Sequence, residues 1–214
     1  MKLRHLLYID ILGFSALAME GSPRINDLYE VITSLNALRD SGFKAIVFSD
    51  TILIYNMDWP DSKDSRQCMV MYLCEFAQDL QHRLIKRNIF FRAVLVKGEF
   101  THYELNSIPC FYGPALIQAH SAEKSLKAIG LFMHTSIVED SHIFKTRPFN
   151  EEYHFAYITQ SIHHVEEYLG GQFPIDKGLL EDSDLIYHLV PEVMHLQQVH
   201  CEMTKQTDPS VSFG

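Results

Sequence analysis

The feature that most constrains the fold is the order in which apolar residues change their spacing along the chain. The strand-like runs are residues 3–12, 44–48, 52–56 and 89–96, and the runs with helical spacing are 26–39 and 67–87. The order is therefore strand, helix, strand, strand, helix, strand. It predicts a ferredoxin-like βαββαβ core, an α+β fold in which an antiparallel sheet carries helices on one face.

The rest of the chain extends this core. Gly113 precedes a run at 114–126 that we expect to be a helix with proline in its first turn, and short strands are expected at 131–133 and 155–159. With 214 residues, 47% of them apolar, the chain has enough material for one large core. We expect a single domain over residues 1–204, with the core at 3–138, a C-terminal elaboration at 139–204 and a flexible tail at 205–214.

Charge and cysteine content exclude several functional classes. The formal net charge of −9 provides no cationic field for nucleic acid or an anionic membrane. The four cysteines form no CxxC pair, and the twelve histidines match no zinc-site spacing. The longest apolar stretches are far shorter than the ~20 residues of a spanning helix. We expect a soluble, reduced, cytoplasmic protein that binds neither nucleic acid nor membrane.

Two aspartates lie at or near the ends of predicted strands. Asp10 lies near the end of the first apolar strand, where an unpaired buried carboxylate is costly, and Asp50 lies at the tip of the expected hairpin. If these strands pair at the centre of the sheet, the two carboxylates become neighbours. Paired carboxylates with open positions suit Mg²⁺ or Mn²⁺, whose coordination is completed by water and substrate phosphates. Asp50 alone would also be compatible with a solvated turn.

Four segments resemble the signatures of class III nucleotidyl cyclases. DILGFS at 10–15 resembles the family's D-I-x-G-F-[ST], and FSD at 48–50 falls where the family has its second metal aspartate. The segment 92–99 resembles R-x-G-[IL]-x-x-G-E, and 112–119 resembles W-G-x-x-V-N-x-A-x-R. The order and spacing match over roughly residues 3–138. The resemblance implies conversion of a nucleoside triphosphate into a 3′,5′-cyclic monophosphate and pyrophosphate.

The resemblance also assigns roles to residues. It implies that Asp10 and Asp50 hold two Mn²⁺ or Mg²⁺ ions per site, with the Ile11 carbonyl as a further ligand. Together with Arg92, these aspartates would be the catalytic residues.

Triphosphate contacts follow from the same alignment. The backbone amides of Gly13, Phe14 and Ser15 would hold the β- and γ-phosphates, at a turn from strand to helix where free N–H groups face an anion. Arg92 would contact the triphosphate, and Lys177, in a weaker match, would be a second cationic contact.

Departures from the family pattern concern the base and the transition state. Purine cyclases read the base with Lys or Glu at the position of Ile46, and with a second residue at the position of Cys110. An apolar Ile46 cannot hydrogen-bond a purine edge. We take Ile46, Phe48 and Cys110 as the base pocket. The family's transition-state Asn and Arg are absent. His120, Glu123 and Lys124 are the polar candidates nearby, and we take Lys124 as the candidate replacement.

These departures resemble the stand-alone pyrimidine nucleotide cyclases of the Pycsar antiphage systems. That resemblance implies a homodimer with sites at the interface, UTP or CTP as substrate, and a cyclic product that activates a separate effector. Two alternatives stay open. One is a purine cyclase that reads the base through groups near Phe48 or Phe111, and the other is a degenerate cyclase domain acting as a nucleotide-binding or dimerisation module.

Overall fold

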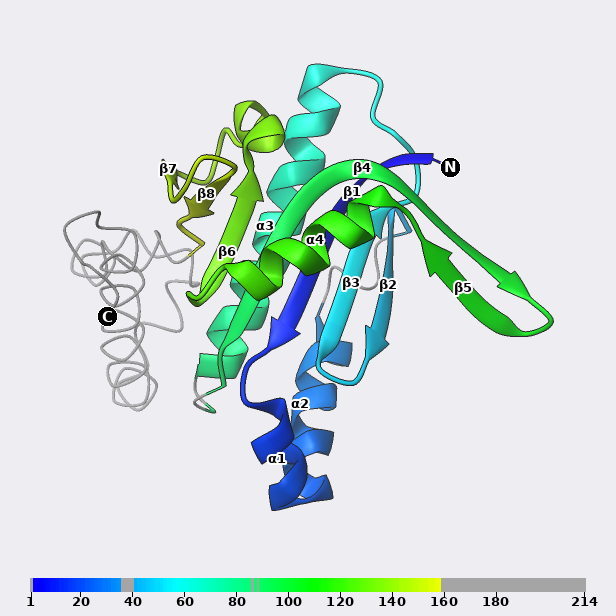
Figure 1. The fold of residues 1–214 in the computed structure, drawn as a ribbon, viewed down its shortest axis with the longest axis vertical. Helices are drawn as coiled ribbons and strands as arrows, with labels where there is room; N and C mark the ends of the chain where they lie inside the picture. The colour runs from blue at the N-terminus through cyan, green and yellow to red at the C-terminus, as the bar shows by residue number, and fades with distance from the viewer. Residues whose placement is uncertain (1, 36–40, 86, 88, 159–214) are drawn as a thin grey trace, which may run out of the picture.

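The computed structural model describes residues 2–35, 41–85, 87 and 89–158, and it contains one mixed sheet with helices on both faces (Figure 1). The strands are β1 (Lys2–Ile11), β2 (Phe43–Phe48), β3 (Thr51–Asn56), β4 (Phe91–Leu105), β5 (Ile108–Tyr112), β6 (Gly130–His134), β7 (Thr146–Pro148) and β8 (Tyr153–Ala156). The helices are α1 (Phe14–Glu20), α2 (Ser22–Ser34), α3 (Lys63–Ile85), α4 (Pro114–Ser125) and the 3₁₀ helix η2 (Thr135–Asp140). Along the sheet the order is β2-β3-β1-β4-β6-β8-β7, and β5 pairs with β4.

Strand β1 is the centre of the βαββαβ core. It pairs antiparallel with β3 on one side and with β4 on the other. Its residues Leu6, Leu7 and Ile9 are fully buried, which explains a continuous apolar run rather than an alternating one. Asp10 lies near the end of this central strand, so its carboxylate is held on a rigid element between two neighbours.

The predicted α+β fold class is confirmed, and the prediction that helices cover one face holds only for the βαββαβ core. Helices α2 and α3 contact each other, and Asp27 of α2 forms an ion pair with Arg87, two residues after the end of α3. Helix α3 lies behind the sheet, whereas α4 crosses in front of β1 and β4 (Figure 1). Helix α4 follows the βαββαβ elements but lies within the predicted core at 3–138, and it leads into β6, which pairs parallel with β4. The sheet is therefore not purely antiparallel.

Strand β4 is longer than its apolar pattern predicts. The prediction ended the strand at Val96, before Gly98, but β4 continues through Gly98 to Leu105 and returns as β5. The turn between them uses Asn106 and Ser107, both with positive φ. This two-stranded arm projects from the body of the molecule (Figure 1), so much of it lacks the buried, periodic pattern that identifies a strand in sequence.

Beyond the arm, the structure extends the predicted core. The expected short strands correspond to β6 and β8, and β7 adds a further strand that the sequence did not indicate. The described part of the predicted elaboration, residues 139–158, therefore continues the same sheet. The remainder of that elaboration, the predicted tail and Lys177 lie outside the described residues. None of the described helices is long and apolar enough to cross a lipid bilayer.

Candidate functional site

The two aspartates predicted to form a metal site come together at one end of the central strands. Asp10 on β1 is the register partner of Thr51 on β3, and Asp50 directly precedes Thr51 at the hairpin tip. The Ile11 amide donates a hydrogen bond to the Asp50 carbonyl at 2.9 Å, which ties the tip to the end of β1. Ser49, with φ of 55°, makes the tight turn that places Asp50 there.

The electrostatics of this carboxylate pair favour a bound cation. Burial, then the charges of Glu123 and Asp50, raise the pKa of Asp10 to about 6, and Arg92 opposes them. Oxygen donors with mutually repelling charges fit a hard divalent cation, which would relieve the repulsion. Among the described residues no three His, Cys, Asp or Glu side chains gather at metal-binding spacing. Other ligands would therefore come from backbone oxygens such as that of Ile11, from water and from substrate.

The turn after β1 contains Gly13, the first of the three residues predicted to contact phosphate. Gly13 has φ of 73° and precedes α1, and a Cβ at this position would meet nothing within 4 Å. The glycine is therefore required by backbone conformation rather than by close packing. Phe14 and Ser15 are the first residues of α1, and the Gly13 carbonyl accepts from the amides of Ala16 and Leu17.

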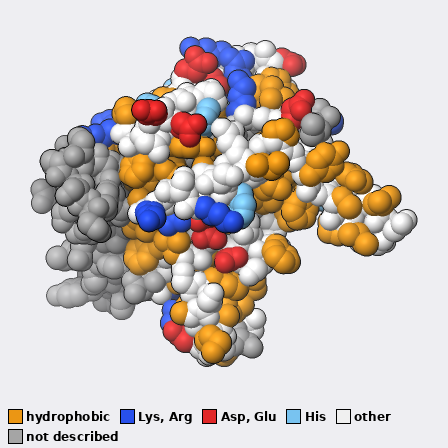
Figure 2. Space-filling model, viewed as in Figure 1, with side chains coloured by type: hydrophobic (Ala, Val, Ile, Leu, Met, Phe, Trp, Pro, Cys, Tyr) orange, Lys and Arg blue, Asp and Glu red, His pale blue; other side chains and the backbone are white. Residues whose placement is uncertain are grey.

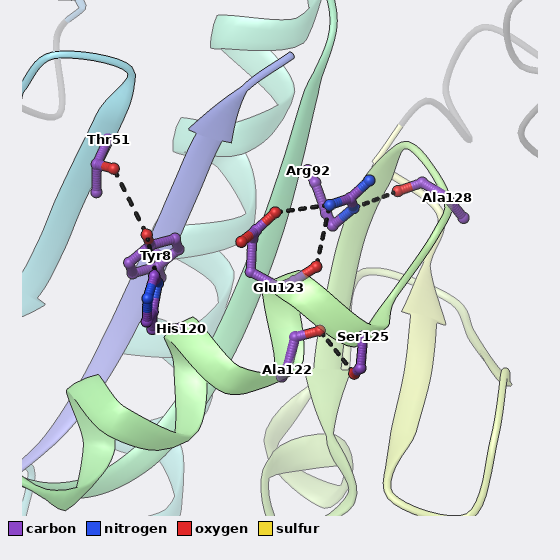
Figure 3. Close-up of polar contacts among 8 residues, drawn as sticks. All are labelled: Tyr8, Thr51, Arg92, His120, Ala122, Glu123, Ser125 and Ala128. Carbon is purple, nitrogen blue, oxygen red and sulfur yellow. Dashed lines mark hydrogen bonds and ion pairs between the residues drawn. The ribbon is translucent and has the colours of Figure 1, made fainter.

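Arg92 lies beside Asp10 but is held by α4. The two residues are register partners on β4 and β1. The Arg92 guanidinium forms an ion pair with Glu123 at 2.6 Å and donates to the backbone carbonyls of Glu123 and Ala128, both at 3.0 Å (Figure 3). Glu123 is buried, so this pair fixes the end of α4 against the sheet.

A pocket of about 340 Å³ lies near the carboxylates, although neither aspartate lines it. Two of its lining residues place it there, because Tyr8 lies two residues before Asp10 and Thr51 directly follows Asp50. Its lining residues are Tyr8, Ile46, Phe48, Thr51, Leu53, Phe111, Leu116, Ile117 and His120. Ile46 and Phe48, two of the three predicted base-pocket residues, therefore share one cavity. Cys110 does not line it, and its thiol instead contacts the Ile108 carbonyl at 3.5 Å on β5.

Several site residues were missed or left without a role by sequence reasoning. Tyr8 carried no motif, although it lies two positions before Asp10 and so on the same face of β1. Glu123 and His120 were polar candidates on the expected helix, but Lys124 was preferred. Lys124 is exposed in the last turn of α4 and does not line the pocket. The i, i+3 spacing of His120 and Glu123, which places both on one helix face, was the available signal.

Comparison with known proteins identifies the fold. No protein-family model matches the sequence, and the search of curated proteins found no match. The adenylyl cyclase CyaB from P. aeruginosa superposes with a TM-score of 0.52 at 11% identity, covering 72% of this chain and 93% of that one. The monomeric guanylyl cyclase domain of the RhoGC fusion protein from the aquatic fungus Blastocladiella emersonii gives 0.56 at 18% identity, covering 72% and 94%.

A third solved structure is the guanylate cyclase domain of RhGC from Catenaria anguillulae in complex with GTP. It gives a TM-score of 0.51 at 13% identity and covers 72% of this chain and 96% of that domain. Each domain is matched almost end to end, although the identities are low. The described chain has the fold of the catalytic domains of adenylyl and guanylyl cyclases.

Proposed function

We propose that this protein is a metal-dependent pyrimidine nucleotide cyclase, which converts UTP or CTP into the 3′,5′-cyclic monophosphate and pyrophosphate. The observation that carries the proposal is the juxtaposition of the Asp10–Asp50 pair with an apolar pocket lined by Ile46. The carboxylates supply a site for cations and triphosphate. The pocket offers no side chain at Ile46 that could hydrogen-bond a purine edge.

The residues of the site have distinct roles in this reaction. Asp10, Asp50 and the Ile11 carbonyl would hold two Mg²⁺ or Mn²⁺ ions, whose charge would activate the attacking 3′-hydroxyl and neutralise the leaving pyrophosphate. The amides of Gly13, Phe14 and Ser15 bind the phosphate chain, and Arg92 contacts it after leaving Glu123. Lys124 is the candidate transition-state donor, supplied by a partner protomer. Most of the catalytic effect is positioning and charge neutralisation.

A homodimer is part of the proposal. Four large apolar side chains are exposed to water in the monomer: Phe48, Phe111, Tyr112 and Ile117. Figure 2 shows hydrophobic side chains gathered along the projecting β4–β5 arm. Such a patch on an otherwise charged surface is typical of a protein interface. We further propose that the cyclic product acts on a separate effector in antiphage defence, the role suggested by the family resemblance.

The test is product identification by mass spectrometry. The full-length chain is incubated with Mn²⁺ and equal amounts of ATP, GTP, CTP and UTP, beside the Asp50→Asn variant, which keeps the shape and removes the charge. Cyclic UMP or cyclic CMP, absent with the variant, is the expected result. Cyclic AMP or cyclic GMP would support the purine alternative, which the fold of the solved adenylyl and guanylyl cyclases favours. With no cyclic product from a folded chain, a non-catalytic nucleotide-binding module becomes the better account.

A further inference from the structure

Three polar side chains lie among the otherwise apolar side chains that line the pocket near the carboxylates. Six of its nine lining residues are aliphatic or Phe side chains, and the other three are Tyr8, Thr51 and His120. These three come from β1, β3 and α4, which lie far apart in sequence. A ring that enters the pocket loses water on its apolar sides, so the fit of its polar atoms to these three side chains decides how well it binds.

The three polar side chains form one connected unit. The Tyr8 hydroxyl lies 3.1 Å from Nδ1 of His120 and 3.5 Å from Oγ1 of Thr51 (Figure 3). The Tyr8 ring is buried on the rigid central strand, so its hydroxyl has a fixed place. Its bond to Nδ1 orients the imidazole, and no other described residue hydrogen-bonds His120. Nε2 has no partner in the described part of the chain and is available to a ligand.

The position of this unit relates the pocket to the reacting end of a nucleotide. Tyr8 lies two residues before Asp10 on the same face of β1, about 7 Å along the strand. Thr51 directly follows Asp50. Strand geometry therefore places the polar unit beside the carboxylates of its own protomer.

We propose that Tyr8 and His120 read the base of the nucleotide substrate, in place of Ile46 and Cys110, with Thr51 as the positioning residue for Tyr8. This inference rests on the proposed function and names the specificity determinants of the same site. A hydroxyl and an imidazole nitrogen together present a donor and an acceptor to the edge of a base. A site built on such partners rejects a base whose edge leaves them unpaired.

The test separates base reading from general damage. Tyr8→Phe and His120→Leu are compared with the wild-type chain in kcat and KM for each of the four nucleoside triphosphates with Mn²⁺. We expect kcat/KM for the preferred triphosphate to fall at least about tenfold, mainly through KM, and for the others to change less than about threefold. His120→Gln, which keeps polar atoms on the side chain, should recover part of the preference.

The chain offers a matched control in a second tyrosine–histidine pair. The Tyr55 hydroxyl lies 2.7 Å from Nδ1 of His102, and neither residue lines the pocket. Tyr55→Phe removes the same kind of hydrogen bond and should leave the ratio of kcat/KM values between triphosphates unchanged. Circular dichroism and thermal unfolding of each variant identify any that fail to fold.

The outcomes distinguish this inference from the proposed function. If the wild-type chain makes a cyclic product and folded Tyr8→Phe and His120→Leu keep its base preference, the inference is overturned and the function stands. If no product forms, the function fails, and equilibrium dialysis with each of the four triphosphates decides the inference. Loss of base preference in these variants, with triphosphate binding retained, supports it. Equal preference in wild type and variants, or no binding at all, overturns it.

Discussion

At the scale of single residues, Asp10 carries its charge half-buried beside two other acidic side chains, Asp50 and Glu123. Its pKa of about 6 in the folded chain lies above the ordinary value of 3.8, so the folded state binds this proton more tightly than the unfolded state. The ionised carboxylate therefore lowers the free energy of unfolding by its full amount above about pH 6, and this effect is absent near pH 4. A bound divalent cation would offset it.

Asp10→Asn removes that charge and keeps the shape of the side chain. Without metal, we expect the variant to unfold at higher urea concentration than the wild type at pH 7.5, and the two to converge near pH 4. Added Mn²⁺ should raise the free energy of unfolding of the wild type only. Urea titrations in chelator across this pH range make the measurement, and a difference independent of pH would contradict the assignment.

His5 shows the opposite dependence on pH. Its ring is fully buried and stacked on Trp59, both ring nitrogens lack partners among the described residues, and burial, with Lys97 and Arg66, lowers its pKa to about 4. The unfolded chain takes up this proton first as the pH falls, so the contribution of neutral His5 to stability is complete above about pH 6.5 and is lost toward pH 4.

His5→Phe should keep the stacking contact and remove this proton uptake. We expect the free energy of unfolding of the wild type to fall relative to that of the variant between pH 6.5 and 4. Thermal unfolding of both proteins in a pH series tests this. If the stabilities of the two proteins change in parallel between pH 6.5 and 4, the pKa of His5 is not lowered by its buried surroundings.

At the scale of elements, Gly113 sets how α4 begins. A Cβ at Gly113 would lie 2.3 Å from the Glu99 carbonyl oxygen and 2.8 Å from the Phe100 Cα, and φ of 151° is one that other residues rarely adopt. Only glycine lets the chain leave β5 this close to β4 and turn into α4. Because α4 carries His120 and Glu123, the positions of both side chains in the site depend on this turn.

Gly113→Ala should therefore lower the free energy of unfolding by about 2–4 kcal/mol, through backbone displacement as well as strain. Gly13→Ala is the comparison, because φ there is also positive but no atom lies within 4 Å of an added Cβ. Strain alone should cost about 1–2 kcal/mol at Gly13. Urea unfolding of both variants gives the two values, and a larger loss at Gly13 would refute this explanation.

The same elements show which parts of the fold can be predicted from apolar sequence patterns and which cannot. The apolar runs of β1 and β3 were predictable because burial in the sheet imposes a pattern that short windows contain. Strand β2 also carries an apolar run, although none of its residues is buried. Helix α2 begins at Ser22 rather than at the predicted residue 26, since its first turn has few apolar residues to extend the pattern. The β4–β5 arm projects from the body, and Gly98 within β4 looked like a strand end.

At the scale of the whole molecule, the exposed apolar patch and the proposed shared sites predict complementation between inactive chains. Asp50→Asn damages the carboxylate pair, and Lys124→Ala removes the transition-state donor that the partner protomer is proposed to supply. If each site of a homodimer takes these parts from different protomers, a heterodimer of the two variants has one intact site. Half the dimers in an equal mixture are such heterodimers, so the mixture should recover about a quarter of wild-type activity.

The measurement is cyclic nucleotide formation by the co-refolded mixture, beside each variant alone. Recovery should increase with protein concentration as dimers form. Activity that stays at the sum of the separate variants would show that each site is built within one protomer. In that case the apolar patch around Phe111 and Ile117 would need another explanation.

The sequence by itself determined the core and the candidate metal site. Apolar spacing defined the central strand and the hairpin, and in such a core the end of β1 and the tip of the β2–β3 hairpin meet, so Asp10 and Asp50 could be placed together. The tertiary structure decided the pairings across the front of the sheet. Tyr8 meets His120 and Arg92 meets Glu123 because α4 lies on the face opposite α3. Local patterns encode which side of a helix is apolar, but the face of the sheet that receives it follows from packing of the whole chain.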